Sequence, residues 1–264
     1  MGSFRFKQFE VVQNHSAMKV NTDAVLLGAW MSVPGGETVR ALDIGTGTGV
    51  IALMAGQRLS ETGVCAHIDA VEIDADACKD AAANFDSAPW AGISFGLHNV
   101  PLQEFAGGAG DADGADGAAG YDLIFSNPPY FISSLKNDSQ AKTTARHTDT
   151  LSQRELLFYS TPLLKEGGTL AIILPVVEGE ELLRKVEFMS DVAVAAGGDT
   201  AALFPSRICY VHTVERKPAK RLMLEFVKCA PSNRPTMRRE QLVMMSGGAN
   251  TQEYACLVGD FYIR

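Results

Sequence analysis

Cysteine and histidine are scarce in this sequence, and they form no cluster. Five of the 264 residues are cysteine and five are histidine, with no C-x-x-C pair and no histidine pair near a cysteine. An odd number of cysteines argues against a disulfide framework, and a zinc site needs several ligands at characteristic spacings. We therefore expect buried thiols and no bound metal.

Long apolar runs are also missing. The longest, "LAIILPVV", is far shorter than the roughly 20 apolar residues that cross a bilayer. The opening "MGSFRFKQF" does not contain the apolar stretch of a signal peptide. Because 46% apolar and 20% charged residues are ordinary proportions for a folded chain, we expect a soluble, cytoplasmic protein with no membrane partner.

Basic residues are outnumbered by acidic ones, yet they are concentrated in one stretch. The net charge is −8, whereas residues 204–239 hold nine Lys and Arg against two Glu, a local charge of +7. Concentrated positive charge is typical of a surface that contacts phosphates. A solvated hairpin tip explains the same charge equally well, so both interpretations remain open on charge alone.

Apolar strand patterns alternate with helical patterns along most of the chain. This alternation predicts an α/β fold, with a mostly parallel sheet covered by helices on both faces and an antiparallel hairpin near the C-terminus. The Gly/Ala/Asp-rich tract 106–120 can bury little apolar surface, so we expect a flexible surface loop there. The expected strands are 39–45, 66–74, 92–100, 121–126 and 169–175, the expected helices are 50–59, 74–85, 152–168 and 179–192, and the expected hairpin lies within 207–230.

A glycine-rich loop joins the first of these strands to the helix that follows. In "LDIGTGTGVIAL" the glycines are Gly45, Gly47 and Gly49. Glycine permits positive φ and allows a ligand to approach the main chain, while N–H groups at a helix start favour an anion. The loop therefore predicts a cofactor site.

Polar residues near this loop limit which cofactor binds there. Glu72, with Ile73 beside it, ends the next predicted strand and is placed to accept hydrogen bonds from the two hydroxyls of a ribose. NAD and S-adenosyl-L-methionine both contain such a ribose. The carboxylate of Asp43 would repel a pyrophosphate but suits a ligand that carries an ammonium and a sulfonium, which favours S-adenosyl-L-methionine. Asn99 either contacts the adenine of the cofactor or is a turn residue.

The segment "FSNPPYF" ends the strand 121–126 with two successive prolines. Methylation of an exocyclic amine needs two fixed hydrogen-bond acceptors for its N–H groups, with no competing donor. Asn127 offers a side-chain carbonyl, Pro128 offers a backbone carbonyl without an N–H, and Pro129 stiffens the turn. Tyr130 provides an aromatic face on which a base can stack. The segment therefore predicts transfer of a methyl group to an amine.

The glycine loop together with this Asn-Pro-Pro-Tyr segment resembles the amino-methyltransferases of the class I S-adenosyl-L-methionine-dependent family. The resemblance implies a Rossmann-like fold with a seven-stranded sheet whose last strand is antiparallel. It also implies that Asn127 contacts both the cofactor and the amine.

Three further segments carry a closer resemblance: "FRFKQFEVVQNHSAMKVNTDAVLLGAW", "ARHTDTLSQREL" and "EYACLVGDFYIR". They are similar to bacterial enzymes that N6-methylate adenosine 37, beside the anticodon, in valine tRNA. The resemblance implies one methyltransferase domain over 1–264, with a family-specific segment 1–30, a core 31–264, an insertion at 106–120 and a basic hairpin at 204–239.

The same resemblance assigns further site residues. It places Lys19, Thr22 and Asp23 over the methionine end of the cofactor, although Asn21 or Thr22 could instead cap a helix that packs on the sheet. It implies the anticodon stem-loop of a tRNA as partner. The candidate phosphate contacts are Arg146, Arg207, Arg216, Lys217, Lys220 and Arg221.

Four other functions remain as alternatives. A protein-glutamine N5-methyltransferase acting on a release factor faces the same chemical problem, and so does another rRNA or DNA amino-methyltransferase. A non-catalytic nucleic-acid-binding protein could keep the cofactor for stability alone. A dehydrogenase is the weakest alternative, because it gives the Asn-Pro-Pro-Tyr segment no role.

Overall fold

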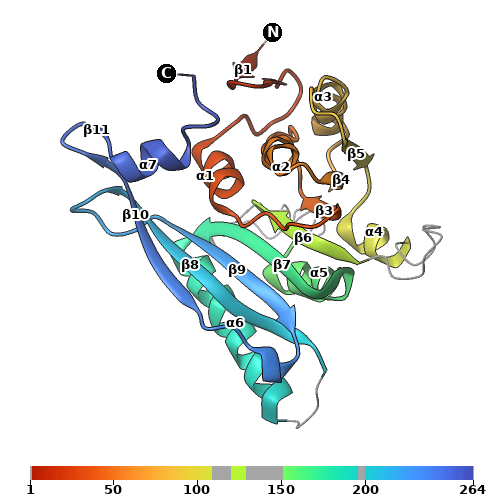
Figure 1. The fold of residues 1–264 in the computed structure, drawn as a ribbon, viewed down its shortest axis with the longest axis vertical. Helices are drawn as coiled ribbons and strands as arrows, with labels where there is room; N and C mark the ends of the chain where they lie inside the picture. Colours follow the sequence, from red (N-terminus) through yellow and green to blue (C-terminus); the bar gives the residue numbers. More distant parts are fainter. Residues whose placement is uncertain (1, 109–119, 129–150, 196–199, 264) are drawn as a thin grey trace, which may run out of the picture.

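The computed structural model describes residues 2–108, 120–128, 151–195 and 200–263 (Figure 1). The strands are β1 (Ser3–Arg5), β2 (Glu10–Val12), β3 (Thr38–Ile44), β4 (Cys65–Val71), β5 (Ile93–His98), β6 (Tyr121–Ser126), β7 (Leu164–Pro175), β8 (Ala202–Val214), β9 (Arg221–Cys229), β10 (Arg238–Ser246) and β11 (Ala249–Asn250). The helices are α1 (Thr22–Trp30), α2 (Val50–Glu61), α3 (Ala75–Asp86), α4 (Leu102–Gly108), α5 (Gln153–Leu163), α6 (Val176–Ala195) and α7 (Gln252–Leu257), with a 3-10 turn at Pro231–Asn233.

One large sheet organises the fold, in the order β11-β10-β8-β9-β7-β6-β3-β4-β5. Strands β5, β4, β3, β6 and β7 are parallel, and β9 is antiparallel to both of its neighbours, β7 and β8. The α/β class and the hairpin are therefore confirmed. The sheet has nine strands instead of seven, because β10 and β11 extend the edge beyond β8.

Helices cover both faces of the sheet, as the strand patterns predicted (Figure 1). Successive residues of β7 point to opposite sides: Ala171 and Ile173 pack in the core cluster that includes α1 and α2, while Leu170 and Ile172 pack in the cluster that includes α5 and α6. Strands buried on both faces carry continuous apolar runs, which explains sequences such as "LAIILP".

The order of the sheet changes direction between β3 and β6. From β3 the chain moves outward through β4 and β5, and it then returns through α4 to place β6 on the other side of β3. In parallel α/β sheets the carboxyl ends of two such strands flank a crevice. The glycine loop follows β3 and Asn127 follows β6, so the fold brings these two predicted segments together.

A helix occupies the first residues of the predicted loop 106–120. Residues 106–108 form the last turn of α4, so that the helix extends further than the glycine-rich composition suggested. Residues 109–119 lie outside the described part of the chain.

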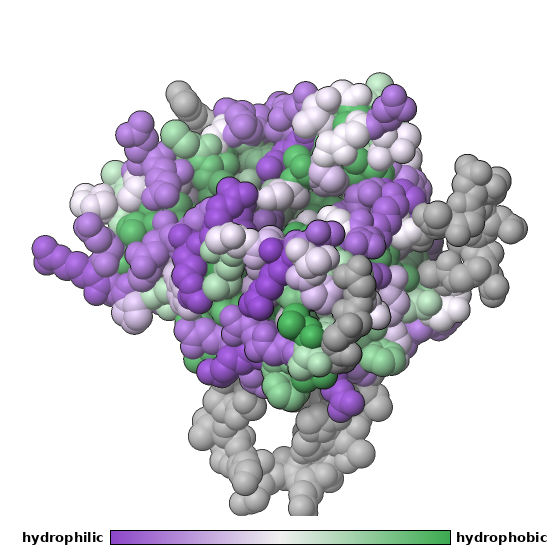
Figure 2. All heavy atoms as spheres, turned by 60° about the horizontal axis from the view of Figure 1, so that its bottom comes forward, coloured by the Kyte–Doolittle hydropathy of each residue, from purple (hydrophilic) through white to green (hydrophobic). Residues whose placement is uncertain are grey.

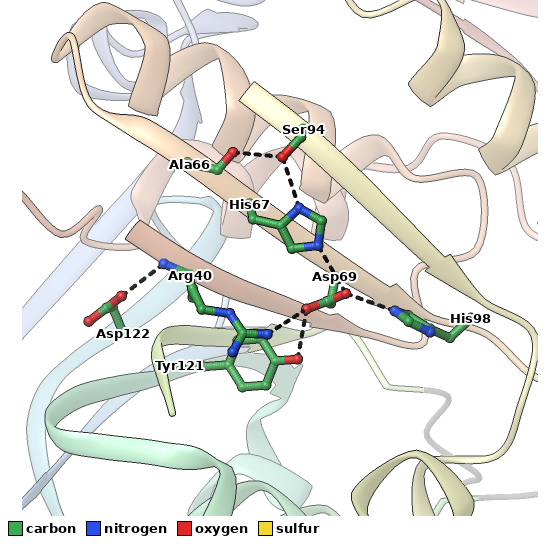
Figure 3. A network of polar contacts seen from close by, with 8 residues as sticks. All are labelled: Arg40, Ala66, His67, Asp69, Ser94, His98, Tyr121 and Asp122. Carbon is green, nitrogen blue, oxygen red and sulfur yellow. Dashed lines mark hydrogen bonds and ion pairs between the residues drawn. The ribbon is translucent and has the colours of Figure 1, made fainter. Parts of the chain in front are cut away.

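A buried carboxylate, Asp69, joins four neighbouring strands of the sheet (Figure 3). Its Oδ1 contacts His98 Nε2 at 2.7 Å and His67 Nε2 at 3.3 Å. Its Oδ2 accepts hydrogen bonds from the Tyr121 hydroxyl at 2.8 Å and from Arg40 at 3.3 Å. Burial raises the pKa of Asp69, but hydrogen bonds from His98 and Tyr121 outweigh this effect and leave the pKa below its ordinary value.

The two ends of the described chain lie close together (Figure 1). The backbone N–H of Lys7 donates to the carbonyl of Phe261, and the rings of Phe6 and Tyr262 stack with centroids 6.1 Å apart. The N-terminal hairpin β1–β2 is thus held on the body of the protein, and the chain that leaves it runs toward the carboxyl end of β3.

Candidate cofactor and catalytic site

The glycine loop has the backbone that its sequence predicted. Gly45, Gly47 and Gly49 have φ of 72°, 57° and 80°, a region that side chains rarely tolerate. A Cβ on Gly49 would lie 2.6 Å from the ring of Phe85, so glycine is needed there for packing. A Cβ on Gly45 or Gly47 would meet no atom of the described residues within 4 Å, so these two leave open space over the main chain.

Most backbone N–H groups of this loop already donate hydrogen bonds to other groups of the protein. The N–H groups of Gly45 and Thr46 donate to the carbonyl of Val71, and that of Gly49 donates to Thr46. The N–H of Gly47 donates to Glu72 Oε2 at 2.8 Å. A pyrophosphate cradle needs free N–H groups, so this arrangement argues against a dinucleotide.

Glu72 lies directly after β4 and is fixed in place from two sides. Besides the bond from Gly47, its Oε1 accepts a hydrogen bond from the backbone N–H of Asp74 at 2.9 Å. A carboxylate has about four acceptor positions, so each oxygen retains one for a ligand hydroxyl. The side chain is therefore oriented before any ligand arrives.

Asp43 is fully buried near the end of β3. Its Oδ2 accepts a hydrogen bond from the Thr46 hydroxyl at 2.7 Å, while its Oδ1 has no partner among the described residues. Burial raises the pKa of Asp43 to about 7, and the bond from Thr46 offsets only part of this effect. Asp43 does not line the cavity, so an ionised Asp43 would act on a cationic ligand group through its charge and not through direct contact.

Asn127 and Pro128 follow β6, and a hydrogen bond from the preceding residue fixes the end of that strand. The hydroxyl of Ser126 donates to the carbonyl of Ile44 at 2.7 Å, which ties β6 to β3 directly beside the glycine loop. The Oδ1 of Asn127 is buried and has no hydrogen-bond partner in the described part of the chain. Pro129 and Tyr130 lie outside the described residues, so the expected stacking surface is not described.

A cavity of about 240 Å³ joins these elements. It is many times larger than the ~10–15 Å³ that one water needs, so it admits a small molecule. Six residues predicted for the site line it: Gly45, Gly47, Glu72, Ile73, Asn127 and Pro128. The open main chain at Gly45 and Gly47 suits a ligand such as S-adenosyl-L-methionine, and the unpartnered oxygen of Asn127 in the same cavity suits an amine that donates a hydrogen bond.

The other residues predicted to bind the cofactor do not line the cavity. Asn21 accepts a hydrogen bond from the N–H of Ala24 and caps α1, so Thr22 is the first helical residue. The amine of Lys19 donates to the carbonyl of Gln13, and Asp23 forms an ion pair with Arg221 at 2.7 Å.

Asn99 does not line the cavity either, but it holds two residues that do, Glu72 and Ile73. Its Nδ2 donates to the carbonyls of Glu72 and Ile73, at 2.9 and 3.1 Å. The amide thus stabilises the turn that carries Glu72, and its contact with an adenine stays a prediction.

The predicted phosphate contacts fall into two groups. Arg207 pairs with Glu240 at 2.8 Å and lies over the ring of Trp30, and Arg221 pairs with Asp23, so both join elements of the fold. Exposed positions in the turn between β8 and β9 are occupied by Arg216, Lys217 and Lys220. Arg146 lies outside the described residues.

Several lining residues were not predicted. Val100, Pro101, Leu102 and Gln103 follow β5 as Asn127 follows β6, so the rule that ligands bind at carboxyl ends could have found them. Ser16, Ala17 and Met18 come from an irregular segment between β2 and α1, and no local pattern marks them. The remaining lining residues outside the prediction are Ile44, Val71, Asp74, Ala77 and Leu151.

Two absences apply to residues 2–108, 120–128, 151–195 and 200–263. Within them, no helix has both the length and the hydropathy to cross a membrane. No group of three or more His, Cys, Asp or Glu side chains in these ranges could hold a metal ion.

Solved structures with the same fold define the class of protein. A predicted O-methyltransferase from Agrobacterium tumefaciens superposes with a TM-score of 0.60 at 18% identity, covering 90% of this chain and 96% of the other. A putative class I S-adenosylmethionine-dependent methyltransferase from Listeria monocytogenes gives a TM-score of 0.55 at 15% identity, covering 94% and 72%. The chain has the class I methyltransferase fold.

Sequence relatives define the family more narrowly, although no family model matches the chain. A protein of Trichodesmium erythraeum is 37% identical over 261 residues, covering 99% of this chain and 98% of its own. Proteins of Parabacteroides distasonis and Tolumonas auensis are each 38% identical, again over 99% of this chain. All three are named tRNA1(Val) (adenine(37)-N6)-methyltransferase, and the chain belongs to this family.

Proposed function

We propose that this protein uses S-adenosyl-L-methionine to methylate N6 of adenosine 37 in tRNA(Val). The observation that carries the proposal is the shared cavity: the unpartnered Oδ1 of Asn127 lies in the same cavity as Gly45, Gly47 and Glu72. Relatives that are 33–38% identical over nearly the whole chain, all named for this reaction, support the choice of substrate.

The residues around the cavity divide into cofactor-binding and catalytic groups. Glu72 would accept the ribose hydroxyls, Ile73 would pack against the adenine, and ionised Asp43 would attract the ammonium of the ligand. Gly45 and Gly47 would allow the ligand to lie against the main chain. When bound, the cofactor supplies an electrophilic methyl group.

Asn127 and Pro128 would act on the amine that receives this group. The lone pair of an adenine N6 is delocalised into the ring, which makes the amine a weak nucleophile. The side-chain oxygen of Asn127 and the backbone oxygen of Pro128 would accept its two N–H groups, localise the lone pair and stabilise positive charge as it develops. The product is acidic enough to lose a proton to water, so no separate strong base is needed.

Replacement of Asn127 tests this mechanism. We expect Asn127→Ala to lower kcat by about 100-fold or more, the typical effect of losing a group that stabilises transition-state charge, and to change the Kd for cofactor by less than about threefold. Transfer of a labelled methyl group to unmodified tRNA(Val) measures kcat, and calorimetry measures the Kd for cofactor.

Gln103→Ala is the matched control, because Gln103 is an amide in the same cavity with no proposed part in the reaction. Its kcat should stay within about threefold of wild type. Undiminished turnover of Asn127→Ala would refute the catalytic role. Methylation of a release factor but not of tRNA would favour the protein-glutamine alternative, and a tRNA in which guanosine replaces adenosine 37 should accept no methyl group.

We also propose that the RNA contacts the basic turn 215–220. Strand β8 runs in the same direction as β7 and β6, so this turn lies at the edge of the sheet where the cavity opens. It lies two to three strand spacings to the side of β6, or roughly 10–15 Å. It also lies beyond the end of β6, because Ser126 is level with Ile208 and β8 continues for six more residues, roughly 20 Å, to Val214. Arg216, Lys217 and Lys220 would meet phosphates of the same RNA roughly 20 Å or more from a target adenosine held in the cavity.

A further inference from the structure

One wall of the cavity is an irregular segment that needs support from elsewhere in the fold. Residues 13–20, between β2 and α1, form neither helix nor strand, yet Ser16, Ala17 and Met18 line the cavity. Met18 is 56% exposed, so little packing holds it in place. Such a segment forms a fixed wall only if polar groups hold its backbone.

Asp80 of α3 supplies this support. Its carboxylate is buried, 1% exposed, and accepts hydrogen bonds from three consecutive backbone N–H groups: those of Asn14 at 3.1 Å, His15 at 2.9 Å and Ser16 at 2.7 Å. Burial raises the pKa of Asp80, but the bonds from Ser16 and His15 outweigh that effect and hold the pKa below its ordinary value.

Asn84, one helical turn further along α3, extends the support to the glycine loop. Its Oδ1 accepts from the N–H of Val12 at 2.7 Å, and its Nδ2 donates to the carbonyls of Val12 and Thr48, at 2.9 and 2.8 Å. Residues four apart lie on the same face of a helix, and Ala77 on this face lines the cavity itself. This face of α3 therefore touches the cavity, the irregular segment and the glycine loop.

From this arrangement we infer that Asp80 is a positioning residue for the cofactor: it holds residues 14–18 in place as a wall of the cavity before the ligand binds. The inference rests on the proposed use of S-adenosyl-L-methionine. A wall that is ordered in advance spares the ligand the entropy cost of ordering it, so the tether acts on cofactor affinity and not on the chemical step.

Asp80→Asn tests the inference, because the amide keeps the size of the carboxylate but offers one acceptor oxygen where three N–H groups need partners. We expect the Kd and KM for S-adenosyl-L-methionine to rise about tenfold, with kcat at saturating cofactor and tRNA within about threefold of wild type. Amide hydrogen exchange of residues 14–16 should accelerate about tenfold, whereas that of residues 78–84 stays unchanged.

Asp76→Asn is the matched control, because Asp76 is an exposed carboxylate on the same helix that pairs only with Lys79 in the structure described. It should change neither affinity nor exchange. A folded Asp80→Asn protein with wild-type affinity, or with a loss confined to kcat, would overturn the inference. If Asp80→Asn fails to fold, Asp80→Glu, which retains the charge, is tested in the same way. Failure of both variants to fold would show that Asp80 is needed for the core itself and would refute a positioning role.

Failure of the proposed function would look different. In that case wild-type protein would bind no S-adenosyl-L-methionine, while the exchange of residues 14–16 would still report on the tether.

Discussion

Asp43 carries a charge that changes near neutral pH. Its pKa is raised from 3.8 to about 7, chiefly because burial disfavours the charged form. Between pH 3.8 and about pH 7, the carboxyl group of Asp43 binds its proton more tightly in the folded protein than in the unfolded chain. Asp43 therefore lowers the stability of the fold progressively as pH rises through this range.

Replacing this carboxyl group should stabilise the protein at alkaline pH. We predict that Asp43→Asn raises the free energy of unfolding at pH 8 by about 2–4 kcal/mol, since each pKa unit corresponds to about 1.4 kcal/mol. At pH 4, where Asp43 is protonated in the folded state, the gain should fall below about 1 kcal/mol. Urea unfolding followed by tryptophan fluorescence measures both values, and an equal gain at the two pH values would contradict the prediction.

Individual site residues were predictable where they follow a recognisable strand. Gly45, Glu72 and Asn127 each come directly after an apolar run, and the carboxyl ends of parallel strands meet at one edge of the sheet. Ser16 could not be found in this way, because Asp80, which holds it, is 64 residues away along the chain. A contact of that range leaves no periodic pattern in the sequence.

Strands β3 to β6 share one buried charge, and their stability should depend on it. We predict that Asp69→Ala lowers the free energy of unfolding by about 3 kcal/mol at pH 7, because it leaves the buried hydroxyl of Tyr121 without its acceptor and removes the ion pair with Arg40. Because the pKa of Asp69 is held below its ordinary value, this stabilisation should be present above about pH 4 and decline as pH falls further.

A surface ion pair gives the control for this measurement. Glu181 pairs with Lys185 on the exposed side of α6, so Glu181→Ala should cost less than about 1 kcal/mol at pH 7. Chemical unfolding curves of the two variants at pH 7 and pH 3 compare them directly. A loss at Asp69 as small as that at Glu181 would show that the strands do not depend on the network in Figure 3.

Helices and strands were predictable in proportion to the apolar surface they bury. Strands β3, β4, β6 and β7 each contain at least four successive buried residues toward their carboxyl ends, and their sequences identified them. Strand β10 buries only Leu242, and β11 pairs with no more than its last two residues, so most of β10 is an exposed edge. Its charged residues at the start disfavour further pairing there. Its sequence therefore resembles that of a loop.

The charge of the whole molecule is unevenly distributed, and the register of the strands decides where each basic cluster lies. Figure 2 shows hydrophilic residues over much of one face, so hydropathy alone does not mark a surface for RNA. The turn 215–220 lies at the edge where the cavity opens. Arg239 pairs with Ile208, about seven residues or roughly 23 Å before that turn, and so lies level with the end of β6 but four strand spacings to its side.

This difference in position allows a comparison at equal change of charge. We predict that Arg216→Glu with Lys217→Glu weakens tRNA binding at least tenfold and reduces the slope of log Kd against log salt by about 1.5, as the loss of two phosphate contacts requires. Arg238→Glu with Arg239→Glu should have little effect on either quantity. Filter binding over a range of salt concentrations measures both, and equal effects of the two pairs would mean that the turn acts only through net charge.

The ion pair between Asp23 and Arg221 has a consequence for how the two ligands influence each other. One continuous stretch of chain runs from the Asp80 tether, along the cavity wall, to Asp23, and Arg221 stands at the base of the basic turn. If RNA on that turn displaces the pair, the methyl donor binds with a different free energy. Thermodynamic reciprocity then requires the methyl donor to alter the affinity for RNA by the same factor, so that each bound ligand changes the affinity of the protein for the other.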